Sequence, residues 1–111
     1  MLEQIEFRFI ESTVFQKEWS RLGYDEEDFI KLTNYLTDNP DAGDIITGTG
    51  GVKKLRWPAP GTRGKSGGLR VIYMAKDKRR TIYFIMVYSK SRQKNLTEAQ
   101  KKILKSHVKQ L

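Results

Sequence analysis

The alternation of apolar and polar residues along the chain predicts a strand, a pair of helices, three further strands and a final helix. Residues 6–10 alternate between polar and apolar side chains and predict the short first strand. Apolar residues spaced by three and four then predict two amphipathic helices, one over 13–22 and one from residue 25 to a stop at Asn39–Pro40. The tight turn between the two helices indicates a helical hairpin.

Polar residues at the helix starts match N-terminal caps. Ser12 and Thr13 each offer a capping hydroxyl, and Thr13 together with Gln16 fits a capping box. Thr97 and Gln100 fit a second capping box, which predicts the start of the final helix.

The three later strands are predicted over 52–57, 69–75 and 81–88, after a possible short edge segment at Ile45–Ile46. Their short connections favour two consecutive antiparallel hairpins. The last of these strands is apolar on both faces, which predicts a central position in the sheet. We therefore expect a single α+β domain over residues 1–111, with its helices on one face of an antiparallel sheet.

The charged residues are segregated along the chain. Eleven of the 13 acids lie in residues 1–44, whereas 17 of the 21 lysines and arginines lie beyond, within a net charge of +8. Such segregation favours one basic face for a nucleic acid or an acidic partner. A generic basic surface is the alternative.

Composition excludes several classes of site. The chain has no cysteine, hence no disulfide framework and no thiolate zinc site. The basic stretch over 50–95 contains one acid, Asp77, so a bound metal is not expected, and no other cofactor is implied. No apolar run approaches the roughly 20 residues that span a bilayer, and no signal peptide is recognisable. These features predict a cytoplasmic protein without a membrane partner.

Two stretches carry a resemblance to a known family. The helical hairpin ends in NPDAGDIITGTGGVKKLRW, and a basic C-terminal helix follows GGLRVIYMAKDKRRTIYFIMVYSKSRQKNLT. In this combination the chain resembles the RelE/HigB superfamily of bacterial toxins over nearly its full length, and more narrowly the HigB-like branch. The resemblance implies a toxin that cuts messenger RNA in the ribosomal A site. A ParE-like toxin directed at DNA gyrase and a non-catalytic nucleic-acid-binding regulator are the alternatives.

The resemblance also implies catalytic cations. Lys54 and Arg56 match the two basic residues of the first of the three later strands, and Arg70 matches the arginine of the following strand. Lys90 falls at the basic position after the last strand, where ribonuclease members often have arginine, and Arg92 could serve there instead. Of these, Arg70 best suits the stabilisation of the charge on an in-line phosphorane.

The groups that would transfer protons are less evident. A C-terminal tyrosine used by some members has no clear match after Lys94, so Tyr88 is the nearest candidate. The chain has one histidine, His107, which is expected to be structural or incidental. A weak acid–base set agrees with an enzyme that depends on the ribosome for substrate geometry.

Further cations are expected to bind RNA without taking part in the chemistry: Lys53, Arg63, Lys65, Arg92 and Lys94. Trp57 and Tyr73 could stack on bases, although packing is favoured. The expected partners are a cognate antitoxin of the helix-turn-helix type, the A site of the small ribosomal subunit and messenger RNA. DNA is expected to be contacted only through the antitoxin complex.

Overall fold

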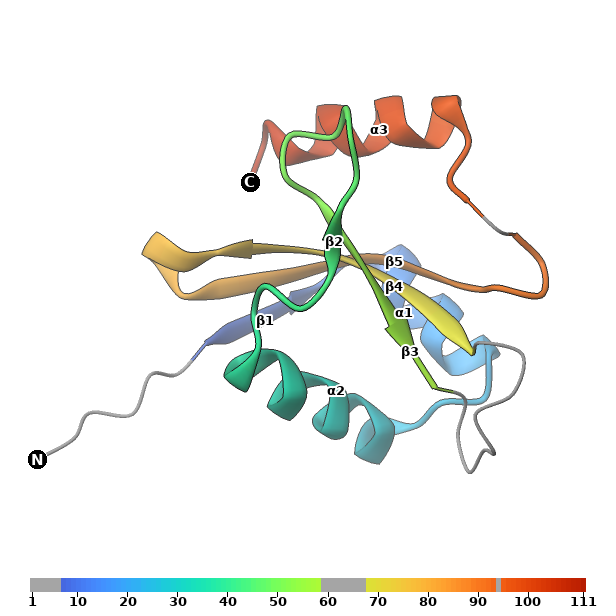
Figure 1. Ribbon diagram of the computed structural model, residues 1–111. Helices are drawn as coiled ribbons and strands as arrows, with labels where there is room; N and C mark the ends of the chain where they lie inside the picture. Colours follow the sequence, from blue (N-terminus) through green and yellow to red (C-terminus); the bar gives the residue numbers. More distant parts are fainter. Residues whose placement is uncertain (1–6, 59–67, 94) are drawn as a thin grey trace, which may run out of the picture.

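A computed structural model describes residues 7–58, 68–93 and 95–111. Its elements follow the predicted order, with one 3-10 turn in addition, and the short edge strand begins at Asp44, one residue earlier than the predicted segment (Figure 1). In chain order they are β1 (Arg8–Glu11), α1 (Thr13–Arg21), α2 (Glu26–Asp38), β2 (Asp44–Ile45), β3 (Lys53–Trp57), β4 (Leu69–Lys76), η1 (Asp77–Arg79), β5 (Thr81–Ser89) and α3 (Glu98–Val108).

The strands form one sheet in the order β1-β5-β4-β3-β2. The two predicted hairpins are confirmed, because β4 pairs antiparallel with both β3 and β5. The central position predicted for β5 is also confirmed, since β5 lies between β1 and β4. The first strand departs from the prediction: β1 runs parallel to β5, so the sheet is mixed.

The helices cover both faces of the sheet, which corrects the expectation that all of them lie on one face (Figure 1). On one face α1 and α2 build a core in which Phe15 and Leu32 pack with Tyr73 and Phe84 of the sheet. On the other face Leu104 of α3 joins a second, smaller core. The sequence predicted this final helix, but an amphipathic helix does not by itself indicate which face of the sheet it covers.

The entry into α1 is fixed by Ser12 rather than by Thr13. The hydroxyl of Ser12 accepts a bond from the backbone N–H of Phe15 at 2.9 Å and donates one to the carbonyl of Ile85 at 2.6 Å. Ile85 is the extra residue of a bulge, because the register between β4 and β5 shifts between Ile72 and Tyr73. The capping box predicted from Thr13 is therefore wrong, because the cap is Ser12, whereas the box predicted at Thr97 is confirmed.

Candidate functional site

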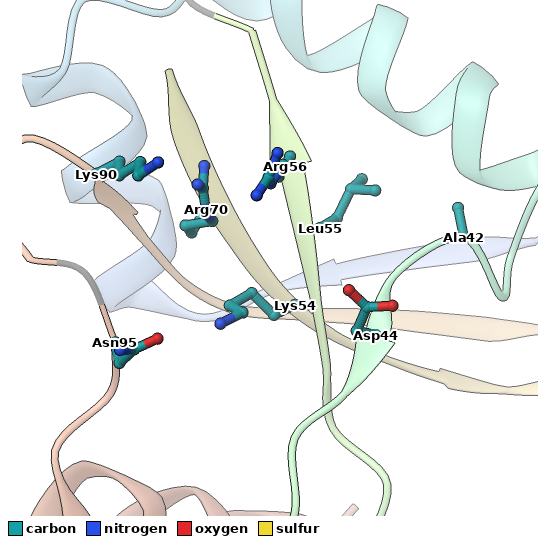
Figure 2. A pocket seen from close by; sticks show the side chains of 8 residues that line it. All are labelled: Ala42, Asp44, Lys54, Leu55, Arg56, Arg70, Lys90 and Asn95. Carbon is teal, nitrogen blue, oxygen red and sulfur yellow. The ribbon is translucent and has the colours of Figure 1, made fainter. Parts of the chain in front are cut away.

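A cleft of about 510 Å³ opens on the α3 side of the sheet, beyond the part of that face which α3 covers. Four of its lining residues are cations. Figure 2 shows the side chains of Arg56, Arg70 and Lys90 directed toward one another, while Lys54 points toward Asn95. The lining comes from β2, β3, β4 and the segments before β2 and after β5: Ala42, Asp44, Lys54, Leu55, Arg56, Arg70, Lys90 and Asn95. The cleft thus contains all four cations that were predicted to be catalytic.

Strand register brings two of the arginines together. Arg56 of β3 pairs with Arg70 of β4, and Arg70 pairs in turn with Tyr88 of β5. Paired residues of antiparallel strands project from the same face, so these three side chains form a row across the sheet. Like charges directly opposite each other destabilise a sheet. The pairing of Arg56 with Arg70 therefore concentrates positive charge on the sheet face that lines the cleft.

Arg70 is the buried cation of this row, with 4% of its surface exposed. Its guanidinium donates a hydrogen bond to the backbone carbonyl of Leu69 at 3.2 Å. Because β4 lies between β3 and β5, the backbone that carries Arg70 is held by ladders on both sides. A guanidinium held in this way is preorganised, so little reorganisation is needed when negative charge develops beside it.

Tyr88 lies in the same row but not at the cleft surface. The residue is 7% exposed, and its hydroxyl is buried without a hydrogen-bond partner in the part of the chain that the structure describes. Burial raises the pKa of Tyr88, and the nearby charge of Arg70 offsets part of that rise. A buried phenol with a raised pKa is poorly placed to exchange protons with a substrate. Its role in proton transfer stays a prediction, and this geometry speaks against it.

The structure separates the two candidates for the cation after β5. Lys90 lines the cleft, and its backbone N–H donates to the carbonyl of Gly68 at 3.1 Å, which ties this position to the start of β4. Arg92 is exposed and is not among the residues that line the cleft. It lies near Glu18 of α1, whose pKa is lowered chiefly by its hydrogen bond with Arg21 and slightly by Arg92. Lys90 is therefore the cation that the fold brings to Arg70.

Two polar residues of the cleft were missed by the sequence analysis, Asp44 and Asn95. Asp44 pairs with Lys54 across the short β2–β3 ladder, and Figure 2 shows both residues among those that line the cleft. Asp44 is the one carboxylate among the described residues that line the cleft. The sequence did not indicate this residue, because Asp44 lies in the acidic N-terminal half. Only the pairing of β2 with β3 brings it to the cleft that the cations line.

A buried tether sets the position of this cleft edge. The hydroxyl of Tyr73 donates to the carbonyl of Pro40 at 2.9 Å and accepts from the backbone N–H of Gly43 at 3.0 Å. A β-carbon on Gly43 would lie 2.9 Å from the backbone oxygen of Lys54, so glycine allows this close approach of the two segments. Tyr73 is fully buried, and the packing role favoured for it over base stacking is confirmed. Its two bonds hold the segment that carries Asp44 against the sheet.

The residues predicted to bind RNA outside the cleft are only partly described. Arg63, Lys65 and Lys94 lie outside the described residues. Lys53 does not line the cleft; next to Lys54 on β3, it projects from the opposite face and pairs with Asp41, Nζ to Oδ1, at 3.3 Å.

His107 is exposed on α3 and does not line the cleft, which agrees with an incidental role. Among the described residues, no group of three or more histidines, cysteines, aspartates or glutamates could hold a metal ion. Within the same residues, no helix has the length and apolar character needed to cross a membrane.

Comparison with known proteins gives one family and one fold. A family model described as the RelE toxin of the RelE/RelB toxin–antitoxin system matches residues 24–111. A mutant of the E. coli toxin RelE in the free state, with two arginines replaced by alanine, has 20% identity and a TM-score of 0.57, over 80% of this chain and 88% of that one.

Two other E. coli structures are similar. The isolated RelE toxin has 19% identity and a TM-score of 0.56, over 91% of this chain and 98% of that one. The intact RelBE toxin–antitoxin complex matches with 21% identity and a TM-score of 0.56, over 75% of this chain and 95% of that one. At these identities the likeness shows a shared fold.

Proposed function

Because the chain belongs to the RelE toxin family, we propose that it inhibits translation as a ribosome-dependent endoribonuclease, which cuts messenger RNA without a metal ion. The observation that carries this proposal is the cleft in which Lys54, Arg56 and Lys90 surround the buried Arg70. Four cations on one sheet face suit a scissile phosphate and its neighbours. The HigB-like branch stays a prediction, as does action in the cytoplasm.

Metal-free cleavage of RNA has three chemical requirements. The 2′-hydroxyl must lose a proton, the phosphorane must be stabilised, and the leaving 5′-oxygen must gain a proton. We assign phosphorane stabilisation to Arg70, because it is the most rigidly held cation, and phosphate binding to Lys54, Arg56 and Lys90. The reaction requires the 2′-hydroxyl, which DNA lacks, so the proposed enzyme would cleave RNA and not DNA.

Proton transfer is where the chain offers least. Within the described residues, the cleft contains no histidine, and Asp44 is its one carboxylate. We propose Asp44 as the residue of this chain best placed to accept a proton from the 2′-hydroxyl, ahead of the buried Tyr88. The small set of acid–base groups supports a requirement for the ribosome, which would align the attacking and leaving oxygens.

The test is cleavage of A-site messenger in a reconstituted translation system. The substitution Arg70→Ala should lower the cleavage rate by about 10²- to 10³-fold, the typical loss when one preorganised donor is removed. Arg79→Ala removes the same charge from the exposed η1 turn and serves as the matched control. Arg70→Lys keeps the charge but not the fork of donors, and should recover only part of the rate. Circular dichroism would establish that each variant is folded.

If the messenger stays intact in the presence of the wild-type protein, the proposal is wrong. If the protein instead inhibits DNA gyrase in a supercoiling assay, the ParE-like alternative is supported. We further propose that an antitoxin covers the cleft with an acidic segment. The antitoxin's affinity for Arg56→Gln and Lys90→Gln variants tests this point, since unchanged affinity would place the contact elsewhere.

A further inference from the structure

The catalytic cleft continues into a groove that runs beside α3. A hollow of about 390 Å³ shares Asp44, Lys54 and Asn95 with the cleft and extends to Thr47 and Lys101. A third hollow, of about 570 Å³, shares Thr47 and Lys101 with the second. The three hollows therefore form one path, which we call the α3 groove where it lies beyond the cleft.

The two walls of the α3 groove come from distant parts of the sequence. One wall is the connection between β2 and β3, which rises from the sheet to the level of α3 (Figure 1). Thr47 and Gly48 belong to this wall. The other wall is α3 itself, through Lys101, Lys102 and Lys105.

Charge in the α3 groove favours a polyanion. Lys102 and Lys105 are exposed, and Lys101 and Lys105 lie one helical turn apart, about 6 Å along the axis at 1.5 Å per residue. One acid, Glu98, lies on the same wall, 3.9 Å from Lys101 between Oε2 and Nζ. Its side chain is 85% exposed, and a pair so open to water contributes little, so it does not cancel the three lysines.

We propose that the α3 groove holds the messenger strand on one side of the cleaved bond, with Lys101, Lys102 and Lys105 on its phosphates. This inference rests on the proposed function. An endonuclease cuts inside a chain, so a strand that enters the cleft must also leave it, and the groove opens directly from the cleft. The exposed lysines on one wall suit a backbone of regular negative charge without base preference.

The test combines two changes, one in the protein and one in the messenger. The protein change is the triple substitution of Lys101, Lys102 and Lys105 by glutamine, which removes charge but retains good helix formers. The matched control replaces three exposed lysines away from the groove by glutamine: Lys17, Lys31 and Lys78. The messenger change is truncation close to the cleaved codon, on either side in turn, in programmed ribosomes.

On the long messenger the groove variant should cleave about tenfold more slowly than wild type, as expected for three exposed ion contacts, while the control triple changes little. On the messenger shortened on the side that the groove holds, wild type and groove variant should cleave equally. This loss of the difference is the coupling that a double-mutant cycle measures.

Other outcomes overturn the inference. A tenfold loss that persists on both shortened messengers would assign the lysines to ribosomal RNA. A groove variant that cleaves like the control triple but binds antitoxin more weakly would assign the groove to the antitoxin. In either case wild type still cleaves the messenger, and the proposed function stands. Absence of cleavage by wild type would instead remove the function on which the inference rests.

Discussion

The tether made by Tyr73 allows a stability prediction that also tests the construction of the cleft. The substitution Tyr73→Phe removes one hydroxyl and leaves the ring, which is fully buried among apolar neighbours. Two hydrogen bonds are lost, to the carbonyl of Pro40 and from the N–H of Gly43. Gly43 is buried, so its N–H would have no water to replace the lost acceptor.

The cost can be estimated from these contacts. Each neutral hydrogen bond contributes about 1 kcal/mol net, so the loss of both costs about 2 kcal/mol, which lies within the range of about 1–3 kcal/mol for a buried donor left without a partner. The substitution should therefore destabilise the fold by about 2 kcal/mol. With an m-value of about 2 kcal/mol/M, the urea midpoint would fall by about 1 M at unchanged m.

Urea unfolding followed by circular dichroism measures this midpoint, with Tyr35→Phe as the control. Tyr35 is 42% exposed, so loss of its hydroxyl should change stability by less than about 0.5 kcal/mol. Cleavage by Tyr73→Phe should also slow, because the segment that carries Asp44 loses its anchor. A midpoint for Tyr73→Phe equal to that of Tyr35→Phe would refute the reasoning, since the tether would then not hold this segment.

Two further predictions concern the helix caps. Ser12→Ala should cost about 2 kcal/mol, because it removes both a cap, at about 1 kcal/mol, and the bond to the bulge carbonyl of Ile85. Thr13→Ala should be nearly neutral in the same unfolding assay, and the reverse order would restore Thr13 as the cap. The pKa of Asp25 in the folded protein is lowered, chiefly by the hydrogen bond from the backbone of Asp28. The ionised Asp25 side chain therefore stabilises the fold fully above its ordinary pKa of 3.8, and this stabilisation is lost as the pH falls through the lower pKa of the folded state. The stability difference between wild type and Asp25→Ala should shrink in that acid range, and a difference that grows there would contradict this account.

The strands of the sheet could be predicted from the sequence because each is a short apolar or alternating run bounded by residues typical of turns. The strand β5 is the clearest case, since apolar residues on both of its faces required neighbours on both sides. The position of β1 could not be predicted, because its short pattern shows a strand but not the strand it pairs with. The sheet face that α3 covers could not be predicted for a similar reason, because the connection after β5 can lead to either face.

Some residues of the candidate site could be predicted from the sequence and others could not. Lys54 and Arg56 could be placed on one face by alternation within a single strand, and the structure brings both to the cleft. Asp44 and Asn95 could not be predicted as site residues. Asp44 lies in a two-residue strand and Asn95 in an irregular segment, and no periodic pattern of side chains predicts where such segments run. Tyr88 was identified by position, but its burial depends on packing across three strands.

The segregation of charge along the chain gains a physical meaning from the two-sided fold. The acids of α2 lie in the layer on the face of the sheet opposite to the cleft. Packed layers lie about 10 Å apart, whereas the screening length at physiological salt is about 8 Å. The helical acids therefore offset little of the positive potential in the cleft. Asp44 differs from them, because the pairing of β2 with β3 places it in the lining of the cleft. A carboxylate repels phosphate, so Asp44 fits the proposed role in proton transfer better than a role in holding RNA.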